Sequence, residues 1–273
     1  MTVMAFCGCA GKPDLSGIKN LAGNKIWVLG HGGMGMNSIH RSNTISSVLE
    51  AIECGANGVE LDIQMTKDQV LVAYHDEYLE PSTDCHGMIN GHTWQEIKNC
   101  KYGWFNKVLS IDTLMQALEN QRDILLSFDC KLIHADDQIQ FSGEFAEALK
   151  RSIEKYHISD RVFIESTDWR FLELLKNAGL KTRMFFYTNT YDRAIAMCEK
   201  LDLFGVSISM ENISKKEIEL LHQQGYYVML FGASSRNKNV KAINMSPDFI
   251  QTDNVSFLHE ALENAQITGV GEL

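Results

Sequence analysis

The stretch over residues 58–64, GVELDIQ, is the clearest fold signal in the sequence. Its side chains alternate in the manner of a β-strand, so Glu60 and Asp62 share one face and Leu61 lies on the other. A helical pattern precedes it over residues 44–54. If the apolar face packs outward against helices, the two carboxylates point to the inside of the sheet.

The same order, an apolar strand followed by a helix, recurs along the chain. Strands are predicted over residues 25–31, 58–64, 124–131, 161–166, 181–187, 205–209, 226–231 and 249–252. Helices are predicted over residues 44–54, 111–120, 143–156, 169–177, 192–201, 215–224, 238–244 and 255–265. Eight strands in strict alternation with helices predict an α/β fold, a (β/α)8 TIM barrel. An open doubly wound sheet is the alternative, although no G-x-G-x-x-G follows the first strand.

One segment interrupts the alternation. Residues 70–75 resemble a strand, and about 35 residues rich in Gly, Asn, His, Cys and Trp separate them from the helix at Ile111. Such a length exceeds that of an ordinary βα loop. We therefore expect an insertion at about residues 76–110, after the second strand, in a single barrel domain over residues 25–273. Residues 1–24 are expected to form an N-terminal extension.

Charge and composition exclude several classes of protein. The formal net charge of −10 has the wrong sign for a nucleic-acid-binding protein. No apolar run has the ~20 residues of a membrane span. The seven cysteines show no zinc-type spacing, so we expect free thiols and a cytoplasmic location. The alternative is an extracytoplasmic lipoprotein, if Cys7-Gly8-Cys9 is the remnant of a truncated signal. The sequence makes no prediction of the oligomeric state.

Polar side chains stand where the early strands end, which is where the reactive groups of a barrel are found. Three carboxylates without cysteine or paired imidazole among them favour Mg²⁺ or Ca²⁺ over Zn²⁺. Histidines outside that set are free to act as acid and base. The alternatives are a solvated E-x-D edge, structural histidines and a plain Asp–Lys ion pair. The side chains concerned are His31, Glu60, Asp62, His75, Asp129 and Lys131.

These motifs resemble those of the glycerophosphodiester phosphodiesterase family. The family pattern reads H-R-G, P-E-N-T, G-A-D-x-[IV]-E-x-D-[VI]-x-x-T-x-D and H-D. The matching segments are His31-Gly32-Gly33, Asn43-Thr44, the run GANGVELDIQMTKD at residues 55–68, and His75-Asp76. Residues 247–253, PDFIQTD, are similar to the family's last strand with its T-D pair. The similarity covers residues 25–258 in order.

The resemblance implies metal-dependent hydrolysis of a small glycerophosphodiester to an alcohol and sn-glycerol 3-phosphate. It maps the catalytic histidines to His31 and His75 and the metal ligands to Glu60, Asp62 and Asp129. Lys131 then contacts the substrate, and one divalent cation, Mg²⁺ or Ca²⁺, is the implied cofactor. Asp129 stands where the family usually has Glu. Aspartate at this position is the choice of the related sphingomyelinase D enzymes.

Two departures affect substrate binding. The family arginine that contacts the phosphate is Gly32 in this sequence, and the glutamate of P-E-N is Ser42. The loss of a guanidinium removes a strong phosphate donor. Arg41 lies in the same loop but is displaced by too many residues to be assumed a substitute. Two alternatives follow: a phosphodiesterase of the same superfamily acting on choline or sphingolipid phosphodiesters, and a catalytically silent phosphodiester-binding protein.

Overall fold

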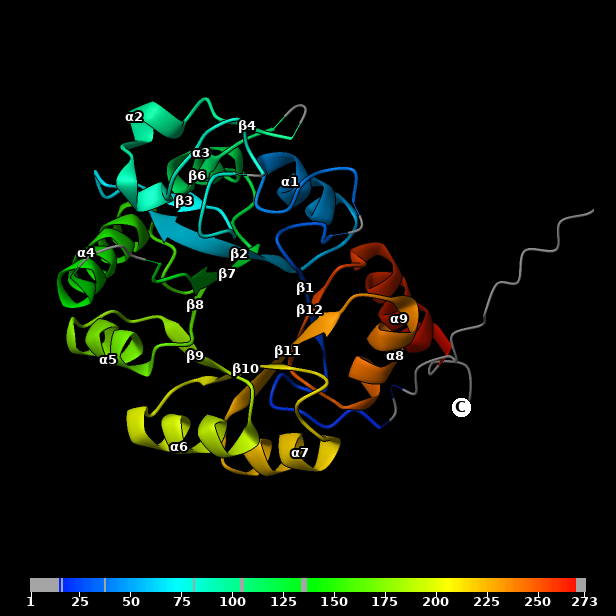
Figure 1. Cartoon of the computed structure of the whole chain (residues 1–273). Helices are drawn as coiled ribbons and strands as arrows, with labels where there is room; N and C mark the ends of the chain where they lie inside the picture. Colours follow the sequence, from blue (N-terminus) through cyan, green and yellow to red (C-terminus); the bar gives the residue numbers. More distant parts are fainter. Residues whose placement is uncertain are drawn as a thin grey trace, which may run out of the picture.

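A closed ring of parallel strands forms the centre of the molecule (Figure 1). The computed structural model describes residues 15, 17–36, 38–80, 82–103, 106–133 and 137–268. β1 pairs with both β12 and β2, which closes the ring and rules out the open sheet. The barrel strands are β1 (Trp27–Gly30), β2 (Gly58–Met65), β7 (Leu125–Cys130), β8 (Val162–Ser166), β9 (Arg183–Thr188), β10 (Gly205–Ser209), β11 (Tyr227–Ala233) and β12 (Phe249–Thr252). The predicted TIM barrel is confirmed.

Helices surround the ring (Figure 1). They are α1 (Ile45–Glu53), α3 (Ile111–Ala117), α4 (Gln138–Tyr156), α5 (Trp169–Asn177), α6 (Tyr191–Leu201), α7 (Lys215–Gln223), α8 (Arg236–Asn244) and α9 (Val255–Thr268). Each predicted helix is present. α4 begins at Gln138 rather than at Gly143, because the Asp137 carboxylate accepts hydrogen bonds from the N–H groups of Ile139 and Gln140.

The segment after β2 builds an extension beside the barrel. β3 (Leu71–Ala73) runs antiparallel to the end of β2, and β6 (Leu109–Ser110) pairs with β3. Between them lie η1 (Ile89–Gly91), α2 (Trp94–Ile97), β4 (Lys101–Tyr102) and β5 (Asn106–Lys107). This segment has a small buried core of its own, which places it as a separately packed unit on one side of the ring. Its members are Val72, Tyr74, Leu79, Ile89, Ile97, Cys100, Tyr102 and Val108.

A disulfide joins Cys85 to Cys100 in this extension. The expectation that all cysteines are free thiols is wrong for this pair, and the argument for a cytoplasmic location loses its basis. Their spacing matches no motif; the chain brings them together by folding back, as the bridge between Thr83 and Tyr102 shows. Among the described residues, Cys54, Cys130 and Cys198 are free.

The N-terminal predictions are not settled by the fold. Residues 1–14, with Cys7 and Cys9, lie outside the described residues, so the extension over residues 1–24 and the lipoprotein alternative remain predictions. No helix in the described part of the chain is long and apolar enough to cross a membrane.

Removing the disulfide should destabilise the extension. The bond closes a loop with a sequence separation of 15 residues, and the loss of such a constraint on the unfolded chain costs about 3 kcal/mol. The double variant C85S/C100S should therefore unfold at lower urea concentration than the wild type, whereas Cys54→Ser, which removes a free thiol, should not. An unchanged midpoint in the double variant would contradict the stabilising role of the bond.

Candidate active site

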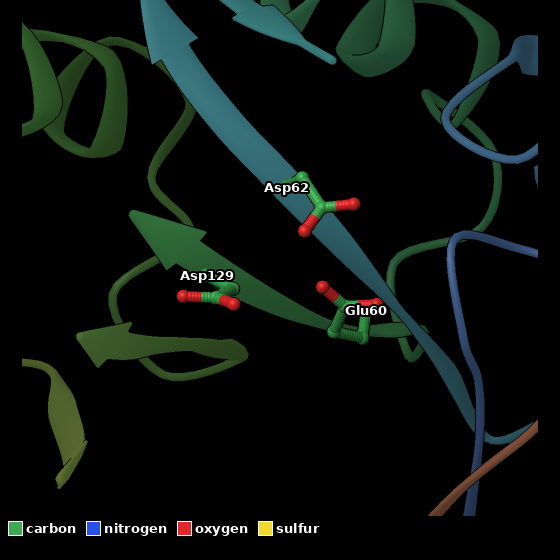
Figure 2. A group of neighbouring side chains, drawn as sticks. All are labelled: Glu60, Asp62 and Asp129. Carbon is green, nitrogen blue, oxygen red and sulfur yellow. The ribbon is translucent and has the colours of Figure 1, made fainter. Parts of the chain in front are cut away.

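Three carboxylates meet inside the barrel. Asp62 of β2 and Asp129 of β7 are register partners on neighbouring strands, and Glu60 precedes Asp62 on the same face of β2. All three are buried, and each offers an oxygen atom within 4.8 Å of the others (Figure 2). The structure thus brings together the carboxylates that the sequence placed at the strand ends.

Lys131 bridges two of these carboxylates. Its Nζ atom lies 3.0 Å from Oδ1 of Asp62 and 2.5 Å from Oδ2 of Asp129. Burial opposes the ionisation of Asp62, but the charge of Lys131 outweighs it and lowers the pKa of Asp62. Burial raises the pKa of Asp129 in spite of the same lysine. For Glu60, burial and the charge of Asp62 together raise the pKa well above its ordinary range.

Lys131 pairs with Asp62 and Asp129, and burial and the charge of Asp62 raise the pKa of Glu60, so one ammonium does not compensate the whole cluster. Three buried carboxylates with one ammonium leave negative charge at a place where its desolvation is costly. Carboxylate oxygens are the ligands of hard cations such as Mg²⁺ and Ca²⁺. The residues present therefore fit a divalent cation.

His31 follows β1 directly and faces the carboxylates. Its Nδ1 atom lies 2.8 Å from Oδ1 of Asp253, and its Nε2 atom lies 3.9 Å from Oε2 of Glu60. Burial opposes protonation of the ring, but the hydrogen bond to Asp253 and the charge of Glu60 outweigh it and raise the pKa of His31 to about 9. The sequence did not identify Asp253 as the partner of His31, although its T-D pair was a signal for it.

His75 approaches the same space from the extension, just after β3. Its Nδ1 atom lies 2.9 Å from Oδ1 of Asp76, and the hydroxyl of Ser82 donates to the other oxygen of Asp76 at 2.8 Å. His31, His75 and Asp62 line one cavity of about 660 Å³. Both imidazoles and one member of the carboxylate cluster therefore share the lining of one cavity.

Two further buried residues were not identified from the sequence. Asn43 donates from Nδ2 to Oδ2 of Asp62 at 2.7 Å, and its Oδ1 accepts from the Asp62 N–H at 3.0 Å, so it orients this carboxylate. In the sequence, Asn43 belonged to the Asn43-Thr44 motif but had no predicted role in the site. Glu165, the register partner of Asp129 on β8, accepts hydrogen bonds from Ser127 and Gln251. Burial, aided by the charge of Asp129, raises the pKa of Glu165 to about 7.

The backbone at Gly32 leaves no room for a side chain. Its φ is +58°, and a Cβ atom would lie 2.5 Å from Cβ of Ser42. The Gly32 N–H donates to Oε2 of Glu60 at 2.9 Å, and its carbonyl accepts from the Asn43 N–H at 2.8 Å. This arrangement keeps position 32 next to the cluster and makes it unsuited to an arginine.

Gly32→Ala should therefore destabilise the protein. Left-handed backbone disfavours alanine by about 1 kcal/mol, and the contact with Ser42 adds strain. We expect the thermal midpoint to fall by about 2–4 °C for each kcal/mol lost. Gly91→Ala is the matched control. A Cβ atom at position 91 would meet no other atom within 4 Å, and the φ of Gly91 is not positive. Equal midpoints for G32A and the wild type would contradict the steric argument.

The protein is a TIM barrel whose centre holds a carboxylate cluster fit for a divalent cation, and two histidines line the cavity at this cluster. The model of the glycerophosphoryl diester phosphodiesterase family matches residues 31–256. The chain therefore belongs to this family of phosphoric diester hydrolases.

Named relatives agree with this assignment. The chain is 33% identical over 148 residues to a glycerophosphodiester phosphodiesterase of Caldanaerobacter subterraneus, covering 52% of this chain and 58% of the relative. It therefore spans little more than half of that relative's length. A second relative, a glycerophosphodiester phosphodiesterase of Bacillus altitudinis, is 25% identical over 232 residues, covering 80% of this chain and 91% of the relative.

Solved structures share the fold. A phosphodiesterase of Oleispira antarctica, in complex with the product sn-glycerol-3-phosphate, has a TM-score of 0.78 at 19% identity, covering 87% of this chain and 96% of that one. A putative glycerophosphoryl diester phosphodiesterase of Silicibacter pomeroyi has a TM-score of 0.79 at 17% identity, covering 94% and 99% of the two chains.

Proposed function

We propose that this protein hydrolyses glycerophosphodiesters to an alcohol and sn-glycerol 3-phosphate, with a divalent cation as cofactor. The observation that carries the proposal is the single cavity lined by His31, His75 and Asp62, with the rest of the carboxylate cluster beside it. Membership of the family and the product in the Oleispira antarctica structure support the same substrate class.

Glu60, Asp62 and Asp129 would hold the cation, which we take to be Mg²⁺ or Ca²⁺. When bound, it supplies Lewis-acid stabilisation of the negative charge on a phosphate oxygen. Asn43 fixes the orientation of Asp62 through two hydrogen bonds. Lys131, next to two of the ligands, offers a second positive contact to the substrate.

The two histidines perform the proton transfers. One imidazole removes the proton from the attacking oxygen as the new P–O bond forms, and the other protonates the alkoxide oxygen that leaves. Asp253 orients His31 through Nδ1, and Asp76 orients His75 in the same manner. Both rings therefore keep Nε2 available for the substrate.

A panel of glycerophosphodiesters, assayed with and without chelator and with products identified, tests this function. We expect release of the free alcohol together with sn-glycerol 3-phosphate, and no turnover after metal removal. Preference for choline or sphingolipid phosphodiesters would indicate the other superfamily activity, for which Asp129 is the argument. Metal-dependent binding without turnover would indicate a silent binding protein, and full activity without metal would refute the proposal.

A further inference from the structure

Arg41 lines the same cavity as His31, His75 and Asp62. Among the described residues, no other arginine and no lysine lines it. Arg41 lies in the loop between β1 and α1, and its side chain is exposed. The positive charge of Arg41 thus lies at the proposed reaction site, on the side formed by the loop between β1 and α1.

The guanidinium of Arg41 packs against the extension. Its Cζ atom lies 5.9 Å from the ring centroid of Tyr102, a cation–π contact. The stem passes over Gly103, where a Cβ atom would lie 3.4 Å from Cγ of Arg41. Within the described parts of the chain, no carboxylate forms an ion pair with it, whereas Lys131 is bound to Asp62 and Asp129.

The nearby carboxylate of Asp76 is already engaged. It accepts hydrogen bonds from His75 and from Ser82. Burial opposes the ionisation of Asp76, but the hydrogen bonds with His75 and Ser82 outweigh it and lower the pKa of Asp76. The charge of Arg41 makes a smaller contribution in the same direction. No described residue accepts a hydrogen bond from the Arg41 side chain, so within this part of the chain its donors remain available to a ligand in the cavity.

The backbone holds Arg41 beside the site. Its carbonyl accepts a hydrogen bond from the hydroxyl of Thr44 at 2.7 Å, and Thr44 caps α1. Next in the chain, Ser42 occupies the space that a side chain at Gly32 would need. The loop thus returns to Gly32, although Arg41 is nine positions away from it in the sequence.

We infer that Arg41 binds the anionic phosphate group of the substrate, an inference that rests on the proposed hydrolysis of phosphodiesters. Lys131 is bound to Asp62 and Asp129 and does not line the cavity, so among the described residues Arg41 is the arginine or lysine side chain that an anion meets there, in a chain of net charge −10. A planar guanidinium presents its N–H donors in a fixed fork that matches two oxygens of one phosphate, whereas an ammonium acts as a point charge. The ring of Tyr102, in the disulfide-bonded extension, lies beside this guanidinium.

Binding of sn-glycerol 3-phosphate in the presence of Mg²⁺, measured by calorimetry, tests the inference. Arg41→Gln should weaken the affinity by roughly 10- to 100-fold, as expected for loss of a charge-assisted bidentate contact. Arg41→Lys should recover part of the loss. The matched control is Arg193→Gln, because Arg193 also lies over a ring, at 5.7 Å from the centroid of Phe186, and does not line the cavity. All variants should keep the wild-type unfolding midpoint.

Equal affinity of the wild type and R41Q for sn-glycerol 3-phosphate would overturn the inference, and so would an equal loss in R193Q. Turnover of a glycerophosphodiester is measured separately on the same proteins. A wild type that binds through Arg41 but hydrolyses no diester would refute the proposed function and leave the assignment of Arg41 standing.

Discussion

Alanine at His31 or at His75 is expected to lower kcat for a glycerophosphodiester by roughly 10²- to 10⁴-fold, the usual contribution of a general acid or base. Each ring is oriented by a neighbouring carboxylate, Asp253 or Asp76, at hydrogen-bond distance. Steady-state kinetics of purified H31A and H75A, with the thermal midpoint measured alongside, checks this result. Near wild-type turnover by both variants would refute the assignment.

The chain offers a matched control for these variants. His222 also pairs with an aspartate, at 2.9 Å between Nε2 and Oδ2 of Asp248, but this pair lies at the end of α7 and before β12, away from the cavity. His222→Ala should lower stability, because it leaves a buried carboxylate with one hydrogen bond fewer. It should leave kcat within a few-fold of the wild type, unlike H31A and H75A.

Removal of the divalent cation should have a comparable or larger effect. Stabilisation of phosphate charge by a metal is worth several kcal/mol, so treatment with chelator should lower kcat/KM by about 10³-fold or more. Mg²⁺ or Ca²⁺ should restore it. The cation should also raise the thermal midpoint, since a ligand that binds only the folded state stabilises it. Rescue titrations with each ion, followed by activity and by thermal unfolding, check both results.

Two variants test whether the metal response depends on the three clustered carboxylates or on any buried carboxylate near them. Glu60→Gln should abolish the metal-induced rise in the midpoint, because it removes one of the clustered carboxylates. Glu165→Gln is the control: Glu165 is buried one strand beyond Asp129 but stands outside the cluster. It should keep the metal response. An equal loss in E165Q would contradict a site built from Glu60, Asp62 and Asp129 alone.

Side-chain alternation and helix periodicity were enough to predict the barrel. All eight predicted strands are present, and Glu60 and Asp62 share one face of β2 as alternation requires. The position of Asp129 could also be predicted, because parallel strands bring their carboxyl ends to one edge of the sheet. These features depend on local spacing and on a regular topology.

Contacts between irregular segments could not be predicted. The hydrogen bond between His31 and Asp253 joins residues 222 positions apart. The hydrogen bonds between Asn43 and Asp62 depend on how the loop between β1 and α1 folds back onto β2. The Cys85–Cys100 disulfide and the placement of Arg41 over Tyr102 have the same origin.

The barrel, the carboxylates on its inner face and the histidines that follow β1 and β3 could be predicted from the amino-acid sequence, because strand and helix periods repeat and can be counted. The groups that orient those histidines, the lack of room for a side chain at position 32 and the placement of Arg41 at the cavity became visible in the folded structure. Loop conformation depends on long-range packing, which local residue spacing does not encode.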